Sequence, residues 1–299
     1  MAAFLEQIKE AFSKLDALLP SVNFSYEVDD FFSDQSKAFY KNLNDFYFPR
    51  LKNCKLHQNQ KFFRITKKYG ELKEEKVSEF YNPPPCYTKY GRCNYHFYPV
   101  FYLSSNPIAA FIETVKKEHI EKRGTYYYLS EWSCQDNVTL NATIFLEESL
   151  KDNHPWKQLE ERYFKEVKST FQFLSSDQIS ELLRFVAGRF LIDNDYRYAS
   201  FLSHDLLYGE PHGADYIVYP SVKEDRVSMN FAFRPQLLLN NSFIFEKVHK
   251  IIVYDFEFNN PELKARWEVE SSFTSVDGLM LLKSKEIDRG FFEQHFNIG

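Results

Sequence analysis

The chain of 299 residues is long enough for one large domain or two small ones, and 44% of its residues are hydrophobic. Its net charge is −5, whereas proteins that mainly bind nucleic-acid phosphates are usually basic, so that class is disfavoured. No apolar window reaches about 18 residues, and Met1–Glu6 does not resemble a secretory leader. We therefore expect a cytoplasmic protein that makes no use of a membrane or of nucleic acid.

Two helices are predicted in the N-terminal part of the chain. Apolar residues keep helical spacing over residues 1–20, and Pro20 ends the pattern. Residues 30–48 are rich in Phe and Tyr and predict a second helix. We therefore expect a helical N-terminal extension over residues 1–55, followed by one domain over residues 56–299.

The next predicted elements alternate between strand and loop before a helix begins. Residues 61–66 and 99–103 predict strands, and the prolines between them exclude a helix or a central strand there. Asn106 followed by Pro107 is typical of the start of a helix. The apolar stripe that follows predicts that this helix continues until Gly124 ends it.

The remainder of the chain predicts strands on both sides of a helical region. Residues 155–210 read as mostly helical, with breaks near Ser175 and Asp193, and residues 265–299 suggest strand pieces and a short last helix. Further strands are predicted at 125–129, 138–145, 215–219, 227–233 and 251–258. Because this order is not a regular βαβ alternation, it predicts an α+β fold with a mixed or antiparallel sheet.

Several common catalytic motifs do not occur. The sequence holds no G-x-G-x-x-G, no Walker A loop, no H-E-x-x-H and no G-x-S-x-G. Its four cysteines form no C-x-x-C pair, so we expect free thiols and no metal site. With only nine glycines, a dinucleotide would have to be bound largely by side chains.

Three residues of different chemistry lie in one short stretch. Arg92 lies in a predicted loop, Tyr102 in the following strand and Glu113 in the next helix, at spacings of ten and eleven residues. A loop, a strand end and the next helix can converge on one cleft, where these side chains could bind phosphate, pack on a ring and oppose a positive charge. The alternative is a surface ion pair, a core aromatic ring and a charge on the flank of a helix.

The segment GRCNYHFYPVFYLSSNPIAAFIET resembles the signature of the RES-domain family, in which Gly-Arg-aromatic-Asn precedes a Tyr-containing strand and an Ala-rich helix with a Glu. The block HGADYIVYPSVKEDRVSMNFAFRP is similar to the later block of that family, and FFRI to its first strand. The resemblance covers about residues 60–240. It implies a fold similar to that of ADP-ribosylating toxins, with NAD consumed as substrate and no cofactor.

The resemblance assigns seven residues to the site. The catalytic residues that it implies are Arg92, Tyr102 and Glu113. The substrate-binding residues that it implies are Arg64, Asn94, Ser221 and Asn230.

Each role follows from the cleavage of NAD at nicotinamide, which leaves a cation-like ribose. Glu113 would hold ribose hydroxyls and oppose the growing positive charge. Arg92 would clamp the pyrophosphate, with Arg64 assisting. Tyr102 would pack against the nicotinamide or donate its hydroxyl, and Ser221 would bind substrate or orient Glu113. The acceptor is left open between water (a glycohydrolase), phosphate (a phosphorylase) and a protein side chain (an ADP-ribosyltransferase).

The sequence departs from the family pattern at three positions of the expected pocket wall. Cys93 stands where the family has Phe or Trp, Phe97 lies where a glycine is usual, and Tyr216 replaces the second glycine of Gly-x-Asp-Gly. These departures keep a non-catalytic NAD-binding sensor as an alternative. The family resemblance also implies a bacterial toxin or defence protein restrained by an antitoxin or immunity partner. A homodimer is left open, as is the role of residues 1–55 as regulatory cap, docking face or simple packing.

Overall fold

The computed structural model describes residues 2–18, 50–56, 60–67, 76–135, 138–192, 196–209, 213–223, 227–259, 262–275, 278–279, 281–284, 287, 291–292 and 296. Within these ranges no helix is both long and apolar enough to cross a membrane. Nor does any group of three or more His, Cys, Asp or Glu side chains in this part of the chain lie close enough to hold a metal ion.

The chain divides into two compact units, and each is built from three separate segments. Unit 1 comprises Met1–Cys54, Pro83–Val100 and Leu140–Tyr219. Unit 2 comprises Lys55–Asn82, Phe101–Thr139 and Pro220–Gly299. The segments alternate along the chain, a division that the composition of the sequence does not indicate.

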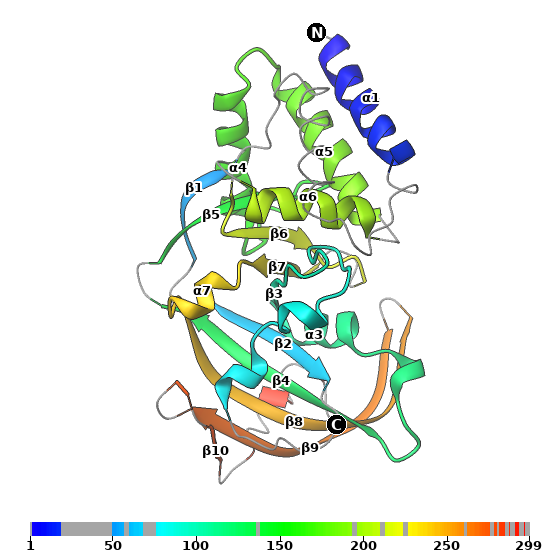
Figure 1. Ribbon diagram of the computed structural model, residues 1–299, viewed down its shortest axis with the longest axis vertical. Coiled ribbons are helices and arrows are strands. Elements are labelled where there is room, and N and C mark those ends of the chain that lie inside the picture. The colour runs from blue at the N-terminus through cyan, green and yellow to red at the C-terminus, as the bar shows by residue number, and fades with distance from the viewer. Residues whose placement is uncertain are drawn as a thin grey trace. The chain divides into compact units, whose positions relative to one another are not determined.

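Unit 1 combines helices with a short set of strands (Figure 1). Its helices are α1 (Ala2–Leu18), α4 (Lys157–Thr170), α5 (Ser176–Ile192) and α6 (Arg197–Tyr208). Its strands are β1 (Leu51–Lys55), β5 (Thr139–Ile144) and β6 (Tyr216–Pro220), in the order β1-β5-β6 with β5 and β6 parallel. Helix α1 packs on α5 through Phe12, whose ring centroid lies 5.3 Å from that of Phe185.

The N-terminal predictions are confirmed in one part and corrected in another. The first helix is confirmed as α1, and the predicted helix at 30–48 lies outside the described residues. The end of the supposed helical extension is wrong, because residues 51–55 form strand β1. Leu51 and Cys54 are buried while the two residues between them are exposed, and Asn53 has a positive φ of 54° that an α-helix does not accommodate.

Unit 2 is an antiparallel sheet on which helix α3 packs (Figure 1). The strand order is β7-β3-β2-β4-β8-β9-β10, and every pairing with a recorded register in this unit is antiparallel. The bounds are β2 (Lys61–Lys67), β3 (Phe101–Ser104), β4 (Thr125–Cys134), β7 (Met229–Phe233), β8 (Phe243–Asn259), β9 (Glu262–Ser275), β10 (Leu281–Lys283), α3 (Pro107–Thr114) and α7 (Gln236–Leu239).

Around β2, β3 and β7, both faces of this sheet carry buried aromatic side chains. On one face Phe63 and Ile65 of β2 pack with Phe111 of α3 in a single core cluster. On the other face Phe62 meets Phe231 of β7 at a ring separation of 5.1 Å. Successive side chains of a strand point to opposite faces, so each strand contributes to both layers.

The helix predicted to run as far as Gly124 ends earlier. Helix α3 stops at Thr114, and Val115 is extended with φ −76° and ψ 133°. The charged residues that follow offer no apolar face to bury, and only a short 3-10 turn, Lys117–His119, forms among them. Gly124, with φ 89°, instead makes the turn into β4.

Most of the remaining predictions are confirmed, and two strands are longer than expected. The helical region breaks after α4 and again after α5, near the predicted positions Ser175 and Asp193. Strand β4 extends five residues beyond the predicted end at residue 129, and the prediction over 251–258 covers only the second half of β8. The overall α+β class with mixed or antiparallel strand pairing is confirmed.

Candidate functional site

Helix α3 positions Glu113 through strong local signals. The Asn106 side chain accepts a hydrogen bond from the Ile108 backbone N–H at 2.8 Å, and Pro107 occupies the first turn. This is an N-cap that fixes where the helix begins. The buried face of the helix packs on the sheet, so the rotation of the helix is set and Glu113 lies, half-buried, near its C-terminal end.

The Glu113 carboxylate is held by two buried donors. Ser221 Oγ donates to Glu113 Oε1 at 2.8 Å, and Asn230 Nδ2 makes a longer contact to the same oxygen at 3.4 Å. Ser221 is 0% exposed and Asn230 is 7% exposed. Among the described residues, no hydrogen bond falls on Oε2 of Glu113, so the carboxylate is oriented through one oxygen and can offer the other to a ligand.

The two donors are themselves fixed by backbone pairing within unit 2. Asn230 lies on β7 opposite Ser104 of β3. The Ser221 backbone N–H donates to the Ser228 carbonyl at 2.8 Å. Two roles were expected for Ser221, binding substrate or orienting Glu113. Its hydrogen bond to Glu113 Oε1 fits the second role.

One residue of this cluster was missed by sequence reasoning. Lys223 Nζ donates to the backbone carbonyls of Ile112 at 2.9 Å and of Glu113 at 3.3 Å, at the C-terminal end of α3. Burial lowers the pKa of Lys223, and the negative charge of Glu113 opposes that shift. A cation at the end of a helix is favourable, and the position of Lys223 two residues after Ser221 was the available signal.

Tyr102 lies in the middle of β3, opposite Ala232 of β7, and is partly exposed. It is two residues from Ser104, so alternation along the strand places it on the face of the sheet that carries Ser104 and Asn230. The predicted Tyr102 and Glu113 thus belong to the same side of unit 2.

Arg64 is placed differently. It alternates with Phe63 and Ile65, which pack with α3, so its side chain starts from the opposite face of the sheet. Its guanidinium lies 5.4 Å from the centre of the Phe101 ring, and its Nη1 is buried without a hydrogen-bond partner among the described residues. Burial lowers the pKa of Arg64 to about 10, an effect that nearby Tyr102 opposes. No described hydrogen bond joins Arg64 to Glu113.

Arg92 is engaged within unit 1. Its Nη1 donates to the carbonyls of Phe190 at 2.5 Å and Leu191 at 2.8 Å, close to the C-terminal end of α5. The guanidinium also lies 5.4 Å from the ring centre of Tyr196 and 5.9 Å from that of Tyr219. The residue therefore caps a helix and stacks on aromatic rings.

Asn94 shapes the loop that carries Arg92. Its side-chain oxygen accepts a hydrogen bond from the Val100 N–H at 3.0 Å, and its carbonyl accepts one from the Gly91 N–H at 3.2 Å. At the departures from the family pattern, Cys93 and Tyr216 are buried, whereas Phe97 is 49% exposed with a positive φ of 68°. A position with positive φ is one where glycine is unstrained.

The predicted site residues therefore fall into two groups. Unit 2 holds Tyr102 and the cluster of Glu113, Ser221 and Asn230 on one side of its sheet, and Arg64 on the other. Unit 1 holds Arg92 and Asn94, each hydrogen-bonded to backbone groups of that unit.

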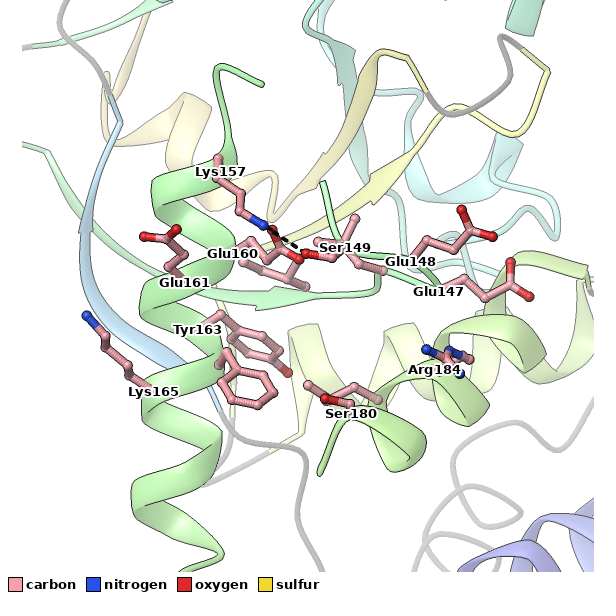
Figure 2. A pocket seen from close by; sticks show the side chains of 14 residues that line it. Glu147, Glu148, Ser149, Lys157, Glu160, Glu161, Tyr163, Lys165, Ser180 and Arg184 are labelled. Atoms are coloured by element: carbon pink, nitrogen blue, oxygen red, sulfur yellow. Dashed lines mark hydrogen bonds and ion pairs between the residues drawn. The ribbon is translucent and has the colours of Figure 1, made fainter. Parts of the chain in front are cut away.

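A separate cavity of about 490 Å³ lies in unit 1 between α4, α5 and the segment after β5, a volume within the range of small-molecule sites (Figure 2). None of the predicted site residues lines it. Lys157 Nζ meets Ser149 Oγ at 2.8 Å, the Leu150 carbonyl at 2.9 Å and a Glu160 oxygen at 2.9 Å. All three donors of this ammonium group are thus used within the protein.

A scan against protein-family models matches no family, and a search of curated proteins finds no match.

Proposed function

We propose that this chain consumes NAD by breaking the bond between nicotinamide and ribose. The observation that carries the proposal is the Glu113 carboxylate, which buried Ser221 and Asn230 hold through Oε1 while Oε2 has no protein partner among the described residues. A half-buried carboxylate with one committed and one available oxygen suits a group that must stabilise a cation-like ribose. The three sequence blocks that resemble the RES-domain family support the same assignment.

In the proposed reaction the electron pair of the bond between ribose and nicotinamide leaves with nicotinamide, which becomes neutral. Glu113 Oε2 binds a ribose hydroxyl and faces the developing positive charge. Tyr102, on the same side of the unit 2 sheet, packs against the nicotinamide or donates its hydroxyl. An acceptor then adds to the ribose carbon and gives its proton to solvent, and the chemistry at Glu113 is the same for water and for phosphate.

The experiment is to incubate the purified full chain with NAD, with and without inorganic phosphate, and to separate the products by chromatography. The expected result is free nicotinamide with a second product, ADP-ribose if water is the acceptor or its phosphorylated form if phosphate is. Label from NAD that appears on protein bands would reassign the enzyme as a protein ADP-ribosyltransferase. NAD that binds without any release of nicotinamide contradicts the proposal.

A non-catalytic NAD sensor is the second candidate, and one observation favours it. The arginine expected to clamp the pyrophosphate donates through Nη1 to two helix carbonyls. A site that lacked this clamp would bind NAD without straining it toward cleavage. Calorimetry with NAD, run beside the release assay, separates binding from turnover.

If the release assay is positive, the biological role follows from the chemistry. Loss of NAD harms any cell that makes such an enzyme. We therefore propose a toxin or defence protein that is restrained by an antitoxin or immunity partner. Co-expression that rescues growth, only while Glu113 is intact, would test that role.

A further inference from the structure

Strand β9 has an outer edge that is largely uncovered. Its inner edge pairs with β8 from Glu262 to Thr274, but on its outer edge β10 covers only Phe273–Ser275, and the Ser284 N–H donates to the Ser272 carbonyl. Among the residues that the structure describes, no other strand pairs with this edge. The stretch Leu263–Ser271 therefore presents backbone donors and acceptors that lack strand partners, which is the usual template for adding another strand.

The side chains of this stretch alternate between two kinds of surface. Leu263, Ala265, Trp267 and Val269 are partly buried against the core of unit 2, and the Trp267 ring lies 5.1 Å from that of Phe296. The residues between them are exposed and charged, with a change of sign half-way along: Lys264, Arg266, Glu268 and Glu270.

This order of charges is self-complementary under two-fold symmetry. In an antiparallel pair, residues directly opposite each other lie on the same face of the sheet. An axis through Trp267 sets Arg266 opposite Glu268 of the second copy. It also brings Lys264 to the level of Glu270, which lies at a β-bulge of β9. Moving the axis to Arg266 or to Glu268 would place that residue opposite its own copy, with like charges in contact. Trp267 is also the midpoint of the stretch Leu263–Ser271 that β10 leaves uncovered.

From this pattern we propose that two copies of the chain pair through β9, with antiparallel Leu263–Ser271 stretches and a two-fold axis at Trp267. Such an interface is isologous, so every contact occurs twice. Edge charges of one sign usually prevent strand addition, whereas the mixed signs here select one partner and one register. The charged groups are already ordered along the strand, since Glu270 pairs with Lys250 and Arg266 stacks 5.4 Å from the ring centre of Tyr254. The inference does not depend on the proposed NAD chemistry.

The test uses two charge reversals of the full chain, Arg266→Glu and Glu268→Arg, with sedimentation velocity over a range of concentrations. The wild type is expected to show a monomer–dimer equilibrium. Either reversal alone makes both copies of one attractive pair repulsive, so each variant should raise the dimer dissociation constant by at least about tenfold. An equimolar mixture of the two variants restores opposite charges at both positions and should dimerise again as a heterodimer.

The matched control is Glu161→Arg, which reverses an exposed charge on α4 of unit 1 rather than one beside the β9 edge and should leave the dimer unchanged. Circular dichroism would establish that the variants are folded. The proposal is overturned if the wild type is monomeric at every concentration. It is also overturned if both single reversals dimerise like the wild type, or if the mixture stays monomeric while the wild type dimerises.

Discussion

Glu113 and Arg92 come from one short stretch of sequence, and the structure uses them in opposite ways. The Glu113 carboxylate receives hydrogen bonds on one oxygen and has the other available. The Arg92 guanidinium gives hydrogen bonds to two helix carbonyls and lies against aromatic rings. Both residues are held in place, but Arg92 uses its Nη1 as a helix cap within unit 1, whereas Glu113 presents Oε2 without a protein partner among the described residues. Motif spacing therefore identifies residues of interest without revealing whether their polar atoms are already used.

The largest effect is expected at Glu113. Replacing it by Gln keeps the shape of the side chain but removes the negative charge, so nicotinamide release should fall on the order of a thousandfold. Steady-state kinetics with NAD would measure the fall, and thermal unfolding should change little. The matched control is Glu118→Gln, an exposed glutamate just beyond α3, which should retain full activity. Equal rates for Glu113→Gln and wild type would show that the Glu113 carboxylate has no catalytic role.

At Arg92 we expect a loss of stability. Arg92→Ala removes two charge-assisted hydrogen bonds and the stacking on Tyr196 and Tyr219, which should cost about 2–3 kcal/mol in the free energy of unfolding. Urea denaturation measures this. A variant as stable as the wild type, but with a raised KM for NAD, would instead restore Arg92 to the substrate-binding role that the sequence predicts.

Replacing Arg64 is expected to stabilise the protein, by less than the loss of Arg92 destabilises it. A buried cation without a hydrogen-bond partner on Nη1 destabilises the fold, so Arg64→Met should raise the free energy of unfolding by about 1–2 kcal/mol at neutral pH. The pKa of Arg64 is about 10 in the folded chain, against an ordinary value of 12.5. Between about pH 10 and 12.5, Arg64 is deprotonated in the folded chain but still protonated in the unfolded chain. The wild type therefore gains stability as the pH rises through this range.

Denaturation of both proteins at pH 8 and above about pH 10 checks this sign, because the advantage of the variant should shrink at the higher pH. The second measurement is the thermal shift caused by pyrophosphate. If Arg64 binds an anion, pyrophosphate should stabilise the wild type and leave Arg64→Met unchanged. A methionine variant less stable than the wild type at neutral pH would show that Arg64 has a stabilising partner.

The smallest effect is expected at Asn94. Asn94→Ala removes the hydrogen bond to the Val100 N–H that closes its loop, which should cost about 1 kcal/mol. Denaturation would detect that change. A much larger loss of NAD turnover than of stability would mean that Asn94 touches substrate, as the family resemblance implies.

The sequence predicts well those features that neighbouring residues determine. Asn106 and Pro107 mark the start of α3 because the capping hydrogen bond spans only two residues. The breaks between the helices of unit 1 were predicted for the same reason, because residues close in sequence determine them. The end of α3 was misjudged because a glycine commonly follows the last residue of a helix, so Gly124 was taken as its end. The helix instead ends at Thr114, where its apolar face stops.

Contacts between distant residues could not be predicted in this way. The partners of Glu113 lie 108 and 117 residues further along the chain, and the two helix carbonyls that Arg92 binds lie 98 and 99 residues away. Family resemblance supplied Ser221 and Asn230 as candidates, but not which oxygen they would hold. Lys223 was overlooked because the helix end that it caps lies more than a hundred residues away, and its place two residues after Ser221 was the only local signal.

The alternation of segments between the two units has a consequence for synthesis on the ribosome. The strand and helix that carry Tyr102 and Glu113 emerge early, while the serine and asparagine that orient the carboxylate belong to the last segment of the chain. A nascent polypeptide thus carries the glutamate for more than a hundred residues of elongation before its two hydrogen-bond donors have been made. If the carboxylate consumes NAD, the order of translation itself delays the hazard until the two residues that orient the carboxylate have been made.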